Sequence, residues 1–430
     1  FKTGTPSRVD RRSLHLEGME LEEGDPENHA FSFMSERKDR NKRNCWLTYT
    51  NEKTHDIIRE NIMRAPKYAG KIHGIGARYC PSIEDKVVRF ADKDRHQLFV
   101  EPEGLDTTEM YVQGMSTSMP IDVQYAFLRT IPGFEDVKMM RPAYAIEYDL
   151  LDPLQLYPTL EVIKLPGLYS AGQSNGTSGY EEAAAQGLVA GINAALKIQG
   201  KDPFILARHE AYIGSLVDDL VTKGADEPYR MMTSRSEYRL ILRQDNADLR
   251  LTEKGHSIGL VGEERYARFL ERKKKYEEAM DYIRTQRFTP KEEINRALES
   301  MGTAPLTTGT GADQILKRPE MTYRKMMEML GCPAFDEEAV EEMEITVKYE
   351  GYIARQEAAV RKAARMENEK LPPDMDYLSL DGISTEARQK MDKIRPLSLG
   401  QAARIPGVSP ADISVLMVYV KQRKGKKGAE

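Results

Sequence analysis

A run of small residues between an apolar segment and an alanine-rich stretch limits the folds open to this chain more than any other feature. We expect residues 165–172 to form a short strand, residues 173–179 a polar loop, and residues 180–198 a helix. Gly187 and Gly191 lie four residues apart, so one face of that helix is nearly bare. A bare face permits close packing on a sheet or on a ligand. The segment indicates an α/β unit.

The polar loop is a candidate ligand site. A glycine-rich loop that leads into a helix presents free backbone N–H groups and the positive end of the helix dipole. It attracts a phosphate or the anionic pyrimidine edge of a reduced flavin. Glu181 and Glu182 fall in the first turn and mildly oppose an anion. The alternative is a tight strand-to-helix turn that binds nothing.

Composition bounds the class of protein. The chain has 430 residues, of which 40% are apolar, enough for two to four domains with real cores. Its 63 basic and 68 acidic residues give a net charge of −5, which neither indicates nor excludes nucleic-acid binding. No apolar run approaches the length that crosses a membrane. We expect a cytoplasmic protein with no membrane contact.

Cysteine and histidine usage argues against metal and disulfide sites. Three cysteines with no CxxC pattern fit a reducing compartment, and none of the seven histidines pairs with another at zinc spacing. No metal site is expected. The chain begins with Phe1 rather than methionine, and we expect a preceding segment to be missing.

Local patterns divide the chain into a mixed region and a helical region. Before residue 155 we expect strands at 45–49, 97–100 and 145–148, a helix at 54–63 capped by Thr54, and a helix at 121–130. Beyond about residue 206 the periodicity is helical, with segments at 263–286, 336–370, 384–393 and 399–404. Ser409 and Pro410 begin a last helix, and residues 371–373 break the longest one and mark a boundary.

Cys80 is the best candidate nucleophile. Arg78 lies two residues before it and would lower the pKa of the thiol, and Pro81 keeps it out of helical geometry. Cys45 lies in an expected strand and Cys332 between a glycine and a proline, so both are weaker candidates. The alternative for any single cysteine is a small buried apolar residue.

Residues 227–250 carry a cluster that could bind nucleic acid. It contains Arg230, Arg235, Arg239, Arg243 and Arg250 together with Tyr229 and Tyr238. Arginine forks bind phosphates, and tyrosines stack on unpaired bases. Because acidic residues are interleaved, the alternative is a salt-bridged helical face.

Together these segments resemble the GidA/MnmG family, flavoproteins that modify the wobble uridine of tRNA. The matching stretches occur in order along the whole chain, at residues 2–6, 78–86, 122–124, 141–149, 171–187, 227–251, 318–323 and 347–353. Ala143 stands where the family usually has glycine, and Ser174 and Ser178 replace commoner residues of the loop. These changes are small-for-small and preserve close backbone approach.

The resemblance implies an α/β plus α fold. It consists of an incomplete FAD-binding Rossmann-like domain with an inserted α+β domain, followed by a helical C-terminal region. The corresponding pieces are 1–12 and 155–205 for the FAD domain, 13–154 for the insert, 206–370 for a helical tRNA-binding domain, and 371–430 for a C-terminal subdomain that meets tRNA or a partner GTPase. The glycine fingerprint of the FAD domain is not in this sequence.

The resemblance also implies site residues. Those for FAD are Gly4, Thr5, Gly172, Gln173, Asn175, Gly176, Thr177 and Gly179. Those for the nicotinamide cofactor are Gly76, Arg78, Tyr79, Ser82, Glu84, Asp85, Lys86, Arg89 and Phe90. Cys80 matches a functional cysteine of the family, and the five arginines fall in the part that binds tRNA.

The implied activity is addition of a carboxymethylaminomethyl or aminomethyl group to C5 of wobble uridine. Methylenetetrahydrofolate donates the carbon, NADH reduces FAD, and the enzyme acts as a homodimer with the GTPase MnmE. Cys80 would add to C6 of the uracil or donate a proton, and this chain by itself is expected to be inactive.

Three other functions stay open. A smaller, related folate-dependent flavoprotein methylates a T-loop uridine, but it lacks the long helical region that we expect here. A non-catalytic module that binds tRNA or a partner protein is the second. A generic flavin oxidoreductase with a helical appendage is the third.

Overall fold

The structure is a computed structural model that describes residues 1–25, 30–35, 42–76 and 81–427, with side chains of the last helix described as far as residue 422. The chain forms two compact units. The first unit is Phe1–Asp202 with Gly224–Arg230, and the second is Pro203–Lys223 with Met231–Glu430. Within the described ranges no helix is both long and apolar enough to cross a bilayer.

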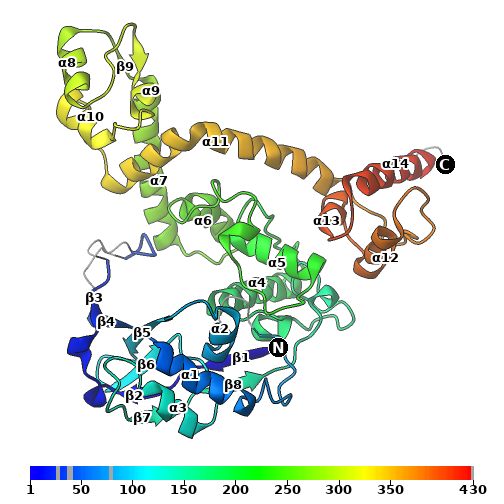
Figure 1. Ribbon diagram of the computed structural model, residues 1–430. Helices are drawn as coiled ribbons and strands as arrows, with labels where there is room; N and C mark the ends of the chain where they lie inside the picture. Colours follow the sequence, from blue (N-terminus) through cyan, green and yellow to red (C-terminus); the bar gives the residue numbers. More distant parts are fainter. Residues whose placement is uncertain (26–29, 36–41, 77–80, 428–430) are drawn as a thin grey trace. The chain divides into compact units, whose positions relative to one another are not determined.

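An antiparallel sheet and three helices form the core of the first unit (Figure 1). The strand order is β3-β4-β5-β6-β2-β7, with bounds Glu20–Glu22, Cys45–Tyr49, Gln97–Pro102, Glu109–Gln113, Arg8–Asp10 and Met139–Arg141. Alternate side chains of β5 and β6 are buried, as in a sheet that covers a core with one face. The helices α1 (Glu52–Glu60), α2 (Ile83–Arg89) and α3 (Ile121–Leu128) supply the opposite side of that core.

The start of α1 differs from the prediction. Thr54 was expected to cap the helix, but the N-cap is Asn51, whose side chain accepts a hydrogen bond from the Thr54 backbone N–H at 3.0 Å. The Thr54 hydroxyl in turn accepts from the Asn51 backbone N–H at 3.2 Å. The two residues form a capping box, so the helix begins three residues earlier than a threonine cap at position 54 would place it.

A two-stranded sheet joins the beginning of the chain to residues 144–147. Strand β1 (Lys2–Thr5) pairs antiparallel with β8 (Tyr144–Glu147). The buried side chain of Gln124 holds the flanks of this pair, because it accepts from the Ser7 hydroxyl and exchanges two hydrogen bonds with the backbone of Ala143. Ala143 is itself buried, which suits a small residue at this position.

The predicted strand at 165–172 is wrong. Residues 156–169 make only isolated bridges, Leu156 with Val162 and Glu161 with Tyr169. Pro166 has no N–H to donate and Gly167 has a φ of +90°, so the chain turns here rather than running straight. A 3₁₀ turn η5 (Gly172–Asn175) and the helix α4 (Tyr180–Ile198) follow, and the helix has the predicted bounds.

The second unit is almost wholly helical, as predicted. Its helices are α5 (Tyr212–Lys223), α6 (Ala247–Ser257), α7 (Glu263–Thr285), α8 (Glu292–Ser300), α9 (Ala312–Leu316), α10 (Tyr323–Leu330), α11 (Glu337–Asn368), α12 (Thr385–Ile394), α13 (Leu399–Arg404) and α14 (Pro410–Lys427). The short strands β9 (Arg287–Phe288) and β10 (Thr310–Gly311) form a small antiparallel pair. The predicted break after residue 370 is confirmed, because α11 ends at Asn368.

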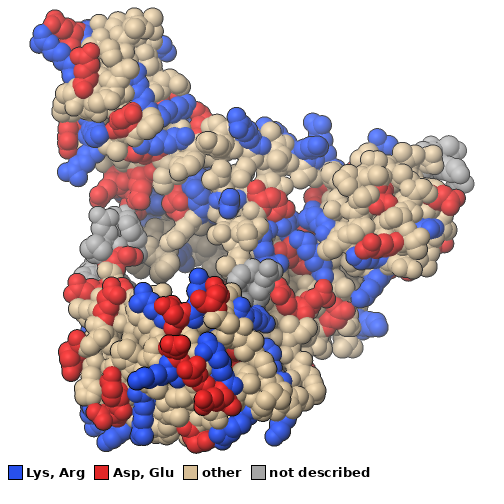
Figure 2. Space-filling view, in the orientation of Figure 1, with Lys and Arg blue, Asp and Glu red and all other residues tan. Residues whose placement is uncertain are grey.

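Helix α11 belongs to two cores of the second unit. Its 32 residues give it a length of about 48 Å (Figure 1). Near its start Met343 and Val347 lie in a core with α7, α9 and α10, and near its end Met366 packs on a core formed by α12, α13 and α14. The mixed region and the helical region that follows it confirm the predicted fold class. The finer division into five pieces stays a prediction. Both signs of charge are interspersed over the visible face (Figure 2).

Candidate functional site

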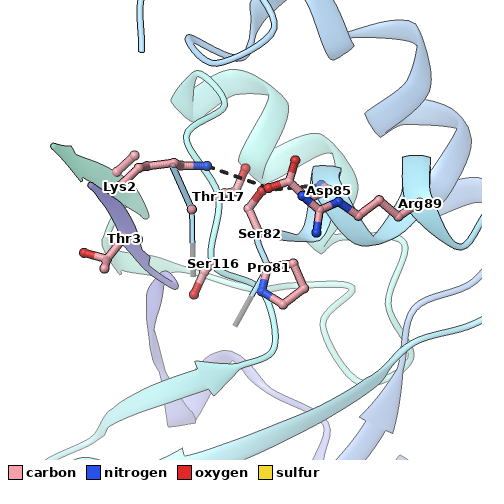
Figure 3. A pocket seen from close by; sticks show the side chains of 11 residues that line it. Lys2, Thr3, Pro81, Ser82, Asp85, Arg89, Ser116 and Thr117 are labelled. Carbon is pink, nitrogen blue, oxygen red and sulfur yellow. Dashed lines mark hydrogen bonds and ion pairs between the residues drawn. The ribbon is translucent and has the colours of Figure 1, made fainter. Parts of the chain in front are cut away.

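A polar cleft in the first unit brings together residues from distant parts of the sequence (Figure 3). Strands β1 and β8, helix α2 and the segment after β6 supply its walls. The lining residues are Lys2, Thr3, Gly4, Gly76, Pro81, Ser82, Asp85, Arg89, Ser116, Thr117 and Ala145. Gly4, which the family resemblance assigned to FAD, therefore lies at the same cleft as four residues that it assigned to the nicotinamide cofactor.

A buried charge cluster forms one wall of this cleft. The Asp85 carboxylate accepts hydrogen bonds from the Lys67 ammonium at 2.6 Å and from the Tyr68 hydroxyl at 3.0 Å, and the Lys2 ammonium lies 4.0 Å away. Burial opposes ionisation of Asp85, but the hydrogen bond from Lys67 and the nearby ammonium charges hold its pKa below the usual value. Burial raises the pKa of Tyr68 to about 12, so Tyr68 stays a neutral donor.

The cluster gives the cleft a positive wall. Two ammonium groups face one carboxylate, and Lys2 is only 4% exposed, so these charges are poorly screened by solvent. Arg89 lies exposed at the cleft and adds a further positive charge. Such a wall favours an anionic ligand.

Helix α2 places Asp85 and Arg89 at the cleft. The Ser82 hydroxyl caps it by accepting from the Asp85 backbone N–H at 3.4 Å. Two neighbours fix the helix to the segment after β6: Glu84 accepts from the Ser118 N–H and hydroxyl, and the Lys86 ammonium donates to the Gly114 carbonyl at 3.1 Å. Glu84 and Lys86 therefore hold α2 in place.

The other residues predicted for the nicotinamide cofactor are divided between the cleft and the surface. Gly76 and Ser82 line the cleft, and Phe90 lies half-exposed at the C-terminal end of α2. Arg78, Tyr79 and Cys80 lie outside the described residues. In the sequence Cys80 directly precedes Pro81, which lines the cleft.

The two described cysteines make poor nucleophiles. Burial raises the thiol pKa of Cys45 and of Cys332. Both thiols are therefore protonated near neutral pH, and the thiolate is the reactive form. This agrees with the sequence argument that ranked both of them below Cys80.

The turn before α4 is rigid because one side chain ties it together. Gln186 accepts from the Gly172 N–H at 3.1 Å and from the Asn175 side chain at 2.8 Å, and it donates to the Thr177 hydroxyl at 3.0 Å. Asn175 and Thr177 are buried and shape the turn, whereas Gln173 is exposed. Of the residues predicted for FAD in this loop, Gln173 is thus the side chain open to a ligand.

Close packing surrounds two glycines of this loop. Gly176 has a φ of +79°, and a Cβ there would lie 2.9 Å from the Ala225 side chain. A Cβ on Gly179 would overlap both the Glu182 carboxylate and the Arg230 guanidinium. Thr5, predicted with them, accepts a hydrogen bond from Arg8 at 2.6 Å.

The five predicted tRNA-binding arginines lie in different surroundings. Arg230 pairs with Glu182 at 3.5 Å beside the first turn of α4. Arg243 binds Asp245 and Glu342, and Arg250 binds Asn246 and two backbone carbonyls, so both are held inside the second unit. Arg239 is exposed and forms no ion pair with any described residue.

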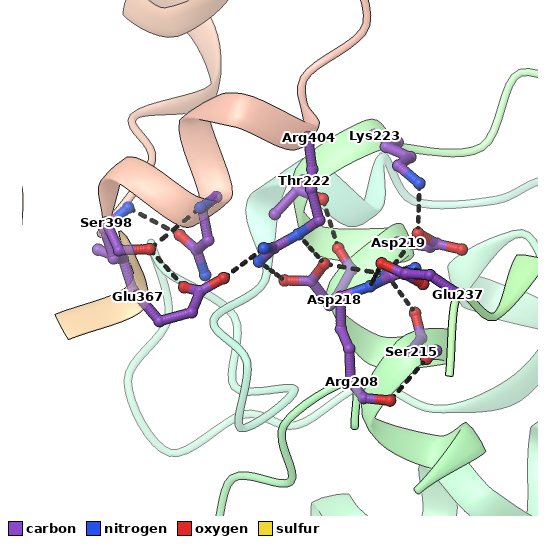
Figure 4. Close-up of polar contacts among 12 residues, drawn as sticks. Arg208, Ser215, Asp218, Asp219, Thr222, Lys223, Glu237, Glu367, Ser398 and Arg404 are labelled. Atoms are coloured by element: carbon purple, nitrogen blue, oxygen red, sulfur yellow. Dashed lines mark hydrogen bonds and ion pairs between the residues drawn. The ribbon is translucent and has the colours of Figure 1, made fainter. Parts of the chain in front are cut away.

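The segment that carries Arg235 and Arg239 is anchored by a buried arginine that the sequence analysis did not select. Arg208 donates two hydrogen bonds of 2.8 Å to the Glu237 carboxylate, one of 3.2 Å to the Arg235 carbonyl, and one of 2.8 Å to Asp219 (Figure 4). Lys2 and Lys67 were also missed. Lysine is usually exposed, so no local pattern distinguishes a buried one.

Comparison with known proteins decides the family. Residues 1–202 match the family described as Glucose inhibited division protein A. A protein of Caldicellulosiruptor saccharolyticus named tRNA uridine 5-carboxymethylaminomethyl modification enzyme MnmG is 56% identical over 429 residues, which is 99% of this chain and 68% of that protein. The chain belongs to the GidA/MnmG family. The resemblance read from the sequence is thereby confirmed.

Further matches cover the helical region, and this chain spans about two thirds of the length of its relatives. Residues 263–357 match the tRNA modifying enzyme MnmG/GidA C-terminal helical domain, and residues 359–430 match its C-terminal helical bundle. An identically named protein of Clostridium kluyveri is 56% identical over 428 residues, 99% of this chain and 68% of that protein. The structure of Aquifex aeolicus GidA in its form II crystal superposes with a TM-score of 0.85 at 46% identity, covering 98% of this chain and 67% of that one.

Proposed function

We propose that this chain is part of a FAD-dependent enzyme that adds a carboxymethylaminomethyl or aminomethyl group to C5 of wobble uridine in tRNA. The observation that carries the proposal is the identity of 56% over 99% of the chain to a relative named for that modification. The enzyme acts in the cytoplasm as a homodimer, together with the GTPase MnmE. The matches to both C-terminal helical domains favour it over the smaller folate-dependent methyltransferase, which lacks that region.

The residues around the cleft and the Gly172 turn fit FAD. Gly76 leaves open space at the cleft, because a Cβ there would meet no atom of the described residues within 4 Å, and the positive wall suits the pyrophosphate of a dinucleotide. Gly4, Thr5, Gly172, Gln173, Asn175, Gly176, Thr177 and Gly179 are the proposed FAD residues. When bound, FAD supplies the hydride chemistry of the reaction. The protein's own part is to hold the Gln173 side chain outward on a turn that Gln186 keeps rigid.

The same cleft is the proposed site for NADH. Its pyrophosphate is anionic, as are the carboxylates of methylenetetrahydrofolate, the proposed carbon donor. Lys2, Lys67 and Arg89 provide the positive field for such groups, and Asp85 holds the two lysines in place. Gly76, Ser82, Asp85 and Arg89 are the described residues with which we expect NADH to interact.

Cys80 is proposed to act on the uracil ring. Addition of its thiolate to C6 would place a negative charge on C5 and O4, and C5 could then attack the one-carbon unit. Loss of the C5 proton and expulsion of the thiolate would restore the ring. A role as proton donor is the alternative for the same residue. Replacing Cys80 with serine should abolish modification in either role, because a serine hydroxyl is far less acidic than a thiol.

The test is flavin binding. The chain alone and the chain joined to the part of the C. saccharolyticus relative that it does not match are mixed with FAD, desalted and examined by absorbance. We expect a stable yellow colour only in the joined protein, and loss of tRNA modification in its Cys80→Ser variant. If the joined protein also fails to retain FAD, the flavoenzyme proposal is wrong and a tRNA-binding module becomes the better account.

A further inference from the structure

Helix α11 exposes two tyrosines and an arginine beyond the core that it shares with α7, α9 and α10. Val347 is buried, but Tyr349 is 47% exposed and Tyr352 is 59% exposed. The two rings lie 6.4 Å apart between centroids, and the Arg355 guanidinium lies 5.9 Å from the centre of the Tyr352 ring. Aromatic rings in this exposed position leave part of a ring face accessible to a ligand.

A glutamine one turn further on fixes a second basic segment beside these rings. The Gln356 side chain accepts from the Leu240 and Ile241 N–H groups at 3.2 and 3.3 Å and donates to the Glu237 carbonyl at 3.2 Å. Residues four apart on a helix share a face, so Gln356 lies next to Tyr352. The segment thus held carries Arg239, which is exposed. The tyrosine–arginine surface consists of Tyr349, Tyr352, Arg355 and Arg239.

The charge of α11 changes along its length. Up to residue 350 the helix is acidic, but the part that follows carries Arg355, Arg361, Lys362 and Arg365 against Glu357 and Glu367. Arg355, Lys362 and Arg365 are exposed and form no ion pair within the described parts of the chain. The helix dipole stabilises cations only in the last turn, so it does not explain the presence of Arg355 in the middle of the helix. Figure 2 shows Lys and Arg side chains along α11 toward α13 and α14.

Gly351 precedes Tyr352 and lies on an open part of the helix surface. It lies in the interior of the helix, where glycine is a poor helix former, and a Cβ on it would meet no atom within 4 Å. Packing within this chain therefore does not require a glycine there. Gly351 and Arg355 are four residues apart and share a face.

We infer that the tyrosine–arginine surface binds tRNA by stacking an unpaired base on Tyr352, with Tyr349 beside it and Arg355 and Arg239 on the adjacent phosphates. The inference rests on the proposed function, which makes tRNA the substrate. Exposed aromatic rings beside arginines are a common combination in proteins that bind single-stranded RNA, and the loops of tRNA supply unpaired bases. A docking site for a protein partner is the competing account.

The first test is the affinity of the full chain for an unmodified tRNA transcript, measured by fluorescence anisotropy at fixed salt. Tyr352→Ala should weaken binding about tenfold, and Tyr352→Phe, which keeps the ring, should stay within about twofold. Tyr157→Ala, at a 42% exposed tyrosine of the first unit, is the matched control and should bind like the parent. Both positions are exposed, so all three variants should fold.

Salt dependence separates the two kinds of contact. Arg355→Ala should lower the slope of log affinity against log salt by about one, because one phosphate contact is lost. Tyr352→Ala should leave that slope unchanged.

In a second experiment, tRNA that contains 5-iodouridine is irradiated with the chain, and the expected adduct lies on the peptide that carries Tyr349 and Tyr352.

Several results would overturn the inference. Unchanged tRNA affinity in both Tyr352→Ala and Arg355→Ala contradicts it, and it does so more strongly if the same variants lose binding to the purified partner GTPase. Adducts confined to other peptides contradict it as well. In each of these cases the parent chain still binds tRNA and the proposed function stands. If the parent chain binds no tRNA, both the inference and the tRNA part of the proposed function are wrong.

Discussion

The guanidinium of Arg404 binds the carboxylate of Asp218 through two parallel hydrogen bonds, Nε to Oδ2 at 2.7 Å and Nη2 to Oδ1 at 2.8 Å (Figure 4). Arg404 lies at the end of α13 and also pairs with Glu367 near the end of α11. Asp218 on α5 also accepts from Arg208 at 3.1 Å. The C-terminal helices are therefore tied to the segment that carries Arg239 through one connected set of charges.

Arg404→Lys should destabilise the protein by about 2 kcal/mol, because lysine keeps the charge but cannot form the paired bonds. The Arg404 and Asp218 side chains are only 19% and 13% exposed, so solvent does not replace the lost contacts. Urea unfolding measures the change. Arg324→Lys is the control, since Arg324 is 86% exposed and pairs with Glu328 on the same helix. Equal losses in the two variants would contradict the prediction.

Glu342→Gln should stabilise the protein increasingly as the pH rises. Burial and the neighbouring Asp245 raise the pKa of Glu342 from 4.5 to about 8. Between those values the folded state binds a proton that the unfolded state has lost, so the free energy of unfolding falls with rising pH. Glutamine removes that dependence, and the gain over the parent should reach roughly 2–4 kcal/mol at pH 8.

The measurement for Glu342 is urea unfolding at pH 5, 6, 7 and 8. Glu341→Gln, at the exposed neighbouring position, should show no growing gain. A constant difference between Glu342→Gln and the parent across this range would show that Glu342 is ionised when folded.

Asp85→Asn should destabilise the first unit by about 3 kcal/mol at pH 7, because Lys2 and Lys67 would then face each other without an anion. The pKa of Asp85 is depressed in the fold, so its contribution is present above its ordinary pKa of 3.8 and disappears as the pH falls through the lower folded value. The difference between parent and variant should therefore shrink below about pH 4. Asp136→Asn, at an exposed carboxylate, is the control, and a pH-independent loss in Asp85→Asn would contradict the account.

Two glycine substitutions in and before α4 should have opposite effects. Gly179→Ala should cost about 2 kcal/mol, since the new Cβ would overlap Glu182 and Arg230. Gly191→Ala should gain up to about 1 kcal/mol, because it lies inside the helix and a Cβ there meets no atom within 4 Å. Thermal unfolding of both variants checks this. A loss in Gly191→Ala would mean that another surface packs on this face.

Local signals in the sequence were enough to place many helices. The bounds of α4 and α13 are those predicted, and α14 begins at Pro410, where Ser409 caps it by accepting from the Asp412 N–H at 3.2 Å. Capping and periodicity act over a few residues, so they can be read without the fold. The predicted strand at 165–172 was wrong because its apolar residues border a proline–glycine turn.

The candidate site could be predicted only in part from the sequence. The family resemblance implied Gly4, Gly76, Ser82, Asp85 and Arg89, all of which line the cleft, but it could not show that they share one cleft. It also could not separate the exposed Arg239 from Arg243 and Arg250, which are bound inside the second unit. All three have the same local charge pattern, and only their tertiary partners differ.

The sequence by itself determined the family, the fold class and the helices whose ends carry capping residues, because each of these depends on the identity and spacing of neighbouring residues. The tertiary structure alone decided which charges are buried together. Lys2, Lys67 and Asp85 meet although they are far apart in the chain, and Arg404 reaches Asp218 across 186 residues. The ionisation and binding properties of such groups depend on desolvation and on partners brought in by folding, and neither is encoded in any short stretch of sequence.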